Sequence, residues 1–331
     1  GDRRRAGVSV ERSRLGSMSE LPRSENFVHL HNHTEYSMLD GAARIKDMFA
    51  TAQEMGMPAI AMTDHGYLFG AHEFWKTAQK YDVKPIIGLE AYVAPGQQHR
   101  TDKEKTRWGE PHQRGDDVSG GGAYTHMTLL SETTEGMHNL FRMGSIASLD
   151  SVYAKWPRLD RELLSQYSKG LIATTGCPSG EVQTRLRLGQ YDEAVAAAAE
   201  FRDILGPENF YCEIMDHGLG IEKDVHQDLM KLAKDLQLPL VATNDLHYTH
   251  EHDAKAHEAL LALQSGSKLN EPSYDQGGSR FAFSGTEYYL KSPRQMRELF
   301  AELPEACDNT LLIAERCEVE FDTKANYMPV F

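Results

Sequence analysis

The chain of 331 residues has the composition of a folded protein, with 40% hydrophobic and 25% charged residues. This excludes a wholly disordered chain, because there are enough apolar side chains to build a sizeable core. Acidic residues outnumber basic ones by 49 to 35, and the net charge of −14 disfavours nonspecific wrapping of nucleic acid over the whole surface. No apolar run approaches the roughly 18 residues that span a membrane. We therefore expect a soluble protein without membrane contact. The four cysteines form no CxxC pair, which fits a reducing compartment such as the cytoplasm.

Residues 1–17 are rich in arginine and show no apolar periodicity. Met18 has the character of a translation start. We therefore interpret residues 1–17 as a disordered leader or a segment added upstream by cloning, and we exclude them from the fold.

From residue 27 almost to 263, short apolar runs alternate with segments whose apolar residues recur every three or four positions. The runs predict seven strands, at 27–31, 59–63, 85–93, 126–130, 171–174, 210–215 and 240–243. The periodic segments predict helices at 42–55, 71–81, 135–147, 181–188, 191–205 and 222–236. This alternation is typical of a parallel sheet covered by helices, either an α/β barrel or a doubly wound sheet.

Two polar stretches with clustered glycines interrupt this rhythm, at 96–123 and 264–285, and predict long loops. Beyond them, the last part of the chain, 292–331, predicts two helices at 293–299 and 304–316 and a tail. Because the tail ends on an apolar run, we expect the chain to be a fragment of a longer polypeptide.

Side chains that bind metals collect near the predicted strand ends. His31 and His33 lie two residues apart at the end of the first strand, so their imidazoles face the same side. The carboxyl ends of barrel strands form one rim, and we expect most of these side chains to meet there. The other members of the set are Asp40, His65, Glu90, His126, Cys177, Asp245 and His247.

Taken singly, these residues have simpler explanations. Asp40 precedes Gly41 and fits a helix N-cap. Glu90 lies inside an apolar run, where a salt bridge would satisfy a buried charge that is otherwise costly. A free cysteine such as Cys177 is usually a small buried hydrophobe. The case for a metal site therefore depends on the position that these residues share.

Histidine, carboxylate and thiolate together can hold more than one divalent ion of the zinc, manganese or iron type. Such a site suits the hydrolysis of phosphate esters. One ion lowers the pKa of bound water towards about 7, and its neighbours stabilise the attacking and leaving oxygens.

Three strings closely resemble the polymerase and histidinol phosphatase (PHP) domain family: LHNHTEYSMLDG at 30–41, TDHG at 63–66 and TNDLH at 243–247. The strings GLEAY at 88–92 and GCPSGE at 176–181 are similar to the branch found at the N-terminus of bacterial DNA polymerase III alpha subunits. The resemblance covers roughly Phe27 to the C-terminus. It implies a distorted (β/α)7 barrel over 18–291, with a metal site at the C-terminal ends of the strands, followed by a segment leading towards polymerase domains outside this chain.

The resemblance also implies three divalent metal ions, zinc or manganese with iron as an alternative. One ion would be held by His31, His33 and Asp245 and would share Glu90 with a second. His126 and Cys177 would complete the second site. The third ion would be held by Asp40, His65 and His247.

The activity implied is that of a 3′–5′ exonuclease, in which metal-bound hydroxide attacks the terminal phosphodiester of a primer during proofreading. We count Asp40 and Asp64 as catalytic; Asp64 would orient a ligand, or else only stabilise a turn. We also expect His217 to contact the substrate. The implied partners are a DNA 3′ end, the rest of the polymerase subunit and, through domains outside this chain, replisome subunits such as the sliding clamp.

Two other functions stay open. The domain could be noncatalytic, a metal-stabilised support for the polymerase or a docking site for a separate proofreading subunit. It could also be a phosphomonoesterase of the histidinol phosphatase type, whose site uses similar ligands.

Overall fold

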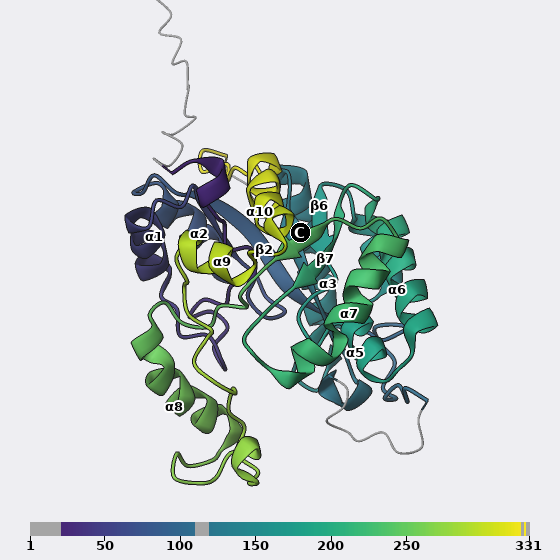
Figure 1. Cartoon of the computed structure of the whole chain (residues 1–331). Coiled ribbons are helices and arrows are strands. Elements are labelled where there is room, and N and C mark those ends of the chain that lie inside the picture. Colours follow the sequence, from purple (N-terminus) through teal and green to yellow (C-terminus); the bar gives the residue numbers. More distant parts are fainter. Residues whose placement is uncertain (1–20, 110–118, 326–327, 329–331) are drawn as a thin grey trace, which may run out of the picture.

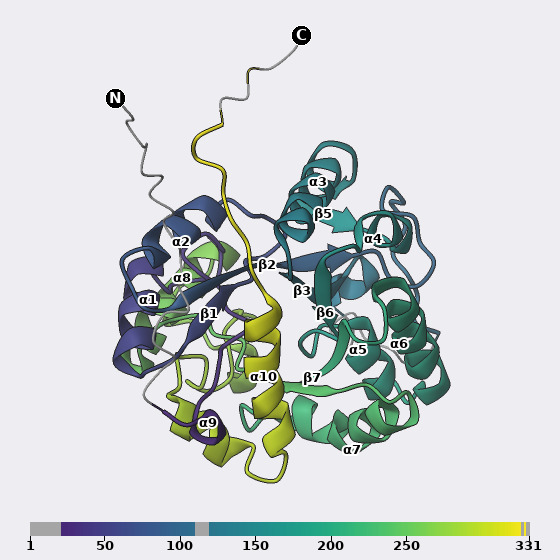
Figure 2. The same cartoon turned by 90° about the horizontal axis from the view of Figure 1, so that it is seen from above.

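The computed structural model describes residues 21–109, 119–325 and 328. The predicted leader, 1–17, lies outside this range, as do residues 110–118 of the first predicted loop. A sheet forms the centre, and helices cover its outer side (Figures 1 and 2). Its eight strands are β1 (Ala59–Met62), β2 (Lys84–Val93), β3 (Thr125–Ser131), β4 (Val152–Tyr153), β5 (Trp156–Leu159), β6 (Leu171–Thr174), β7 (Phe210–Ile214) and β8 (Leu240–Ala242).

The strands follow the order β4, β5, β2, β3, β6, β7, β8. Strand β1 pairs with the first part of β2, and β5 pairs with the last part of β2. The pairs β1–β2, β2–β5, β6–β7 and β7–β8 are parallel. The expectation of an all-parallel sheet is wrong at β3, which runs antiparallel to both β2 and β6. Its first residues therefore lie at the same rim as the last residues of the parallel strands.

The first predicted strand, 27–31, forms no regular strand but occupies a strand position. On one side its backbone bonds to β1, through Ala61 N to His29 O at 3.0 Å. On the other side it bonds to the chain after β8, through His33 N to Leu246 O at 2.7 Å. The sheet is thus a mixed α/β barrel that is distorted at this position and not closed by a continuous ladder of hydrogen bonds.

Ten helices surround the described part of the sheet. They are α1 (Ile45–Glu54), α2 (Ala71–Ala78), α3 (Thr134–Asp150), α4 (Arg161–Tyr167), α5 (Glu181–Arg187), α6 (Tyr191–Leu205), α7 (Gly220–Asp235), α8 (Ala254–Ser265), α9 (Pro293–Leu299) and α10 (Pro304–Arg316). All eight predicted helices are present, whereas α4, α8 and the hairpin of β4 and β5 were not predicted. Figure 1 shows α8 and the residues after it projecting from the body of the protein. None of the helices in the described ranges is long and apolar enough to cross a membrane.

Helix α10 connects β8 with the N-terminal segment 27–31, which takes the place of a strand in the barrel (Figure 2). The Asn309 side-chain amide donates to the carbonyl of Leu240 in β8 at 2.7 Å. The neighbouring Thr310 hydroxyl, which is fully buried, accepts from the backbone N–H of Val28 at 3.1 Å. The helix therefore satisfies backbone groups that a continuous strand pair would otherwise satisfy.

Thr310→Val is expected to lower the free energy of unfolding by about 1–3 kcal/mol, because it keeps the shape of the side chain but leaves the Val28 N–H buried without an acceptor. Urea denaturation measures the change, with Thr323→Val at an exposed position as the control. An unchanged unfolding midpoint would show that α10 does not support this edge of the barrel.

Candidate metal centre

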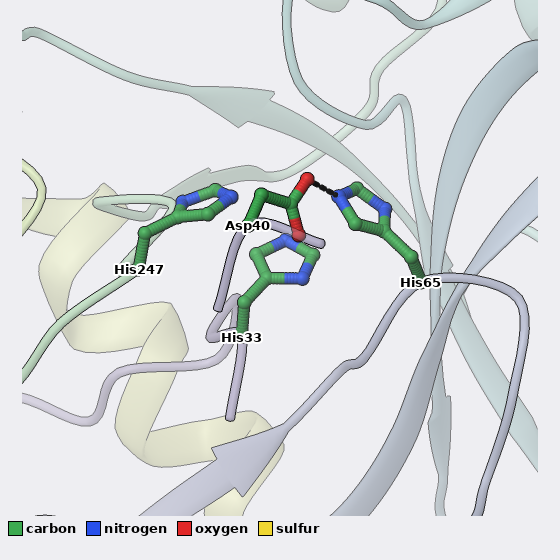
Figure 3. Close-up of side chains that lie close together, drawn as sticks. All are labelled: His33, Asp40, His65 and His247. Carbon is green, nitrogen blue, oxygen red and sulfur yellow. Dashed lines mark ion pairs between the residues drawn. The ribbon is translucent and has the colours of Figure 1, made fainter. Parts of the chain in front are cut away.

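The nine predicted ligands converge at one end of the barrel. His31 and His33 come from the extended N-terminal segment, His65 follows β1, Glu90 lies in β2 and His126 lies in β3. The remaining four, Asp40, Cys177, Asp245 and His247, come from loops. Figure 3 shows the side chains of His33, Asp40, His65 and His247 together.

Glu90 is at the centre of this group. Its Oε1 lies 2.9 Å from His126 Nδ1 and 3.3 Å from both His31 Nε2 and Cys177 Sγ. Its Oε2 lies 2.7 Å from His65 Nδ1 and 3.4 Å from His33 Nε2. One buried carboxylate therefore contacts five of the other eight side chains, so Glu90 could contribute an oxygen to more than one metal site.

The first cluster consists of His31, His33 and Asp245, whose ligand atoms lie within 4.8 Å of one another. Asp245 Oδ1 is 3.2 Å from His33 Nε2 and 3.4 Å from His31 Nε2. Asp245 has a positive φ of 41°, which is uncommon for a residue other than glycine and marks local backbone strain. Both imidazoles are fully buried, so this cluster is closed to solvent on the histidine side.

A second cluster brings Asp40, His65 and His247 together with His33. Asp40 Oδ2 lies 2.9 Å from His65 Nε2 (Figure 3). The turn that presents Asp40 needs Gly41, since a Cβ there would lie 2.0 Å from the carbonyl oxygen of Thr34. His33 therefore lies between this cluster and the first, whereas the family resemblance assigned it to the first alone.

The third cluster consists of His65, Glu90 and His126. Cys177 Sγ adjoins it, 3.6 Å from His126 Nδ1 and 3.3 Å from Glu90 Oε1. His65 contacts Asp40 through Nε2 and Glu90 through Nδ1, so it lies between two clusters. His126 reaches this rim from the first part of β3 because that strand is antiparallel to its neighbours.

The unsatisfied atoms of these side chains test whether the residues fit metal ions. Buried nitrogen or oxygen atoms without a hydrogen-bond partner usually cost about 1–3 kcal/mol each. Eight such atoms gather here, and nitrogen and oxygen ligands of this kind suit zinc, manganese and iron. They are His31 Nε2, His33 Nε2, Asp40 Oδ1, His65 Nδ1, Glu90 Oε2, His126 Nε2, Asp245 Oδ1 and His247 Nε2.

The electrostatics of the centre favour cations. Burial alone would raise the pKa values of Asp40, Glu90 and Asp245, but the imidazoles beside them lower all three below the ordinary range. Burial, reinforced by His65 and His247, lowers the pKa of His33 to about 3, so this ligand stays neutral. Anionic carboxylates and neutral imidazole are the forms that bind divalent ions; the neighbouring carboxylates raise the pKa values of His31 and His65 above the ordinary range despite burial, so these two rings would release a proton when an ion binds.

Three histidines present Nε2 to the centre because a protein group occupies Nδ1. His31 Nδ1 lies 2.7 Å from Glu213 Oε1, and His247 Nδ1 lies 2.8 Å from the carbonyl of Asp245. His33 Nδ1 lies 3.0 Å from the hydroxyl of Ser37. Neither Ser37 nor Glu213 was predicted to take part in the site. For Glu213, the sequence feature that could have indicated a role is a carboxylate inside an otherwise apolar strand.

Asp64 supports the centre from behind. Its carboxylate accepts from the Thr34 N–H at 2.6 Å, the Thr34 hydroxyl at 2.8 Å and the Ser37 hydroxyl at 2.9 Å. Burial raises the pKa of Asp64 to about 6. Because Ser37 also contacts His33, Asp64 is connected to this candidate ligand through Ser37, and its predicted catalytic role stays a prediction.

His217 does not have the exposure that the expected substrate contact requires. Its side chain is buried and stacks on Tyr288 with ring centroids 4.3 Å apart. Nδ1 lies 2.6 Å from Glu222 Oε1, and Nε2 lies 2.8 Å from the carbonyl of Asn244. Both nitrogens are therefore used within the protein, and we do not retain His217 as a substrate ligand.

The family model of the PHP domain matches residues 29–217. The chain belongs to the PHP domain family. The matched part contains seven of the nine predicted ligands of this PHP domain, and Asp245 and His247 follow it.

Known proteins extend the comparison. The PHP domain is 53% identical over 309 residues to the DNA polymerase III subunit alpha of Mycobacterium leprae, covering 92% of this chain and 26% of that protein. It is 57% identical over 300 residues to the corresponding subunit of Saccharopolyspora erythraea, covering 88% of this chain and 24% of that protein. The chain thus spans about a quarter of the length of these relatives. Among solved structures, it resembles a two-domain Bacteroides vulgatus protein containing a predicted PHP-like metal-dependent phosphoesterase, with 14% identity and a TM-score of 0.37 over 93% of this chain and 68% of that one.

Proposed function

We propose that this PHP domain is a metal-dependent phosphodiesterase that removes nucleotides from a DNA 3′ end, as the proofreading part of a DNA polymerase III alpha subunit. The observation that carries the proposal is that all nine predicted ligands are present and meet at one place. Eight of these side chains each bring a buried nitrogen or oxygen atom that has no hydrogen-bond partner. A domain that bound no metal would not need so many buried polar atoms without hydrogen bonds in one place, because each of them costs stability.

The clusters differ in access, and this indicates where substrate would enter. The side chains of Asp40 and His65 are 15% and 16% exposed, whereas those of His31 and His33 are fully buried. We expect the scissile phosphate to approach from the side of Asp40 and His65. Divalent ions held there would acidify a water molecule and neutralise charge on the phosphate. Asp40 and His65 would hold the exposed ion, and Glu90 would fix its distance from the buried one.

The partners that we propose follow from this role: a primer 3′ end, the rest of the polymerase subunit and, through domains outside this chain, replisome subunits such as the sliding clamp. The net charge of −14 predicts weak capture of DNA by this chain alone, so neighbouring domains would have to supply positive charge.

One observation favours a noncatalytic role as the second candidate. In the cluster of His31, His33 and Asp245 both imidazoles are fully buried and only Asp245, 15% exposed, reaches solvent, so an ion held mainly by the imidazoles would stabilise the fold without meeting a substrate. Such a domain would bind metal but hydrolyse nothing.

Asp40→Asn tests the proposal, because Asp40 is at the accessible edge of the centre. We expect the rate of hydrolysis of a 3′-labelled primer to fall by more than about 100-fold. Loss of a residue that only hydrogen-bonds to a metal ligand lowers activity by about 10- to 100-fold, and loss of the ligand itself should lower it further. After the metal ions are removed from both proteins, the melting temperatures of the variant and the wild type should agree within about 2 °C, so that lost activity does not reflect lost folding.

The primer is compared with a small phosphate monoester in the same assay. Loss of primer hydrolysis in the variant supports the exonuclease. A metal-loaded wild-type protein that cleaves neither substrate would favour the supporting role, and one that cleaves only the monoester would favour a phosphomonoesterase.

A further inference from the structure

Glu213 is a fully buried carboxylate near the end of β7, and it lies behind the metal centre rather than in it. Its Oε1 lies 2.7 Å from His31 Nδ1 and accepts from the Thr243 hydroxyl at 2.6 Å. Its Oε2 accepts from the hydroxyls of Thr128, at 3.1 Å, and Thr174. Four donors thus fill both oxygens, which is what a buried carboxylate needs to remain stable.

These donors come from different parts of the barrel. Thr128 lies in β3, Thr174 ends β6, and Thr243 directly follows β8. His31 comes from the N-terminal segment that takes the place of a strand. Glu213 therefore links His31 to β3, to the end of β6 and to the residue that follows β8.

The bond also fixes the state of the His31 ring. A carboxylate only accepts hydrogen bonds, so Nδ1 carries the hydrogen, and Nε2 offers its lone pair to an ion once the His31 ring is neutral. Nε2 has no hydrogen-bond partner and points between Glu90 Oε1 and Asp245 Oδ1, at 3.3 and 3.4 Å. The imidazole is thus oriented as a metal ligand before any ion binds.

His33 provides an internal comparison. Its Nδ1 also has a fixed partner, but that partner is the neutral hydroxyl of Ser37, with the carboxylate of Asp64 one hydrogen bond further away. Of the two histidines of this cluster, only His31 has a buried carboxylate directly at Nδ1. A directly bonded carboxylate orients a histidine ligand and raises its basicity more strongly than a neutral hydroxyl does.

We propose that Glu213 is a positioning residue of the metal centre, which holds His31 in the orientation and tautomer that bind the buried ion of the His31, His33 and Asp245 cluster. This inference rests on the metal centre of the proposed function. Loss of the Glu213 charge should weaken one ion selectively, because within the described part of the chain the contacts of the Glu213 carboxylate are with His31 and three threonines and not with Asp40, His65 or His247.

The test is chelator competition on protein loaded with Zn²⁺, with the zinc released per chain as the readout. In Glu213→Gln we expect one ion per chain to bind about 10- to 100-fold more weakly, while the others bind as in wild type. Thr243→Val removes one donor to Oε1 and leaves the carboxylate in place, so it should shift the same ion in the same direction by a smaller factor.

Leu229→Ala is the control for stability. Leu229 of α7 is buried in the same core cluster as Cys212, the neighbour of Glu213 in β7, so the variant destabilises this region without touching the centre. It should release zinc as wild type does. Co²⁺ loading adds a spectroscopic readout, since the absorption bands of the buried ion should change in Glu213→Gln and not in Leu229→Ala.

The inference would be overturned if Glu213→Gln released zinc as wild type does. It would also be overturned if Leu229→Ala, at a comparable loss of stability, released zinc as readily as Glu213→Gln. If Glu213→Gln does not fold, Thr243→Val decides, because unchanged zinc affinity in that variant overturns the inference as well. Wild-type protein that holds zinc but cleaves no DNA would contradict only the proposed function, so the two failures are distinguishable.

Discussion

Glu90→Gln is expected to lower kcat/KM for hydrolysis of a 3′-labelled primer by about 150- to 5,000-fold and to remove at least one metal ion per chain. Glu90 lies within 3.4 Å of His31, His33, His65, His126 and Cys177. Removing one partner of such a buried charged network costs about 3–5 kcal/mol, which corresponds to this loss if it falls on binding of the ions and the transition state. Primer kinetics and elemental analysis of the same preparation measure both effects.

Asp160→Asn is the matched control for this variant. Asp160 is also a buried carboxylate paired with a cation, Arg100 at 3.0 Å, but it caps α4 and is not among the nine ligands. It should lower stability while leaving the metal content and the activity per folded molecule unchanged. Glu90→Gln protein with a full complement of ions and normal primer hydrolysis would refute the bridging role of Glu90.

Removal of the metal ions is expected to destabilise the protein strongly. An ion present at about 1,000 times its dissociation constant contributes roughly 4 kcal/mol to the free energy of unfolding, and a chain of this size gains about 2 °C in melting temperature per kcal/mol. The melting temperature should therefore fall by at least about 8 °C after treatment with a chelator. Differential scanning calorimetry before treatment, after it, and after zinc or manganese is restored measures the effect.

The reversal on adding metal is the decisive part of this experiment. Mg²⁺ serves as a control ion, because it prefers oxygen ligands and retains its waters, whereas this centre offers five imidazoles and a thiol. A melting temperature that is identical with and without chelator would mean that the eight unsatisfied atoms are not compensated by ions.

Much of the fold could be predicted because the apolar periodicity of the helices and strands is local. The antiparallel direction of β3 could not, since its residues alternate in the same way whichever way the strand runs. The direction matters for His126, which was predicted as a ligand at the start of a strand, because the start of a parallel strand would lie at the rim opposite the other ligands. The antiparallel pairing of Tyr92 with His126 brings it to the same rim.

The N-terminal segment shows a second limit of sequence reasoning. The two-residue spacing of His31 and His33 correctly indicated that both face one side, although the segment has backbone bonds to β1 and to Leu246 without becoming a regular strand. Strand regularity depends on partners distant in sequence, whereas the alternation of side chains needs only an extended backbone.

The supporting residues were the hardest to predict. Glu213 is recognisable in sequence only as a carboxylate in an apolar strand, and its role depends on His31 and three threonines that are 30 or more residues away. Sharing of His33 and His65 between clusters likewise depends on distances that spacing does not determine.

A crystal structure with anomalous scattering recorded at the zinc, manganese and iron absorption edges tests the central claim most directly. We expect three ions among the nine side chains. If the ions are zinc, each imidazole ligand nitrogen should lie about 2.0–2.1 Å from its ion, and Cys177 Sγ about 2.3 Å from its ion. Crystals soaked in these metals that show no anomalous peak between Glu90, Asp40 and Asp245 would contradict it.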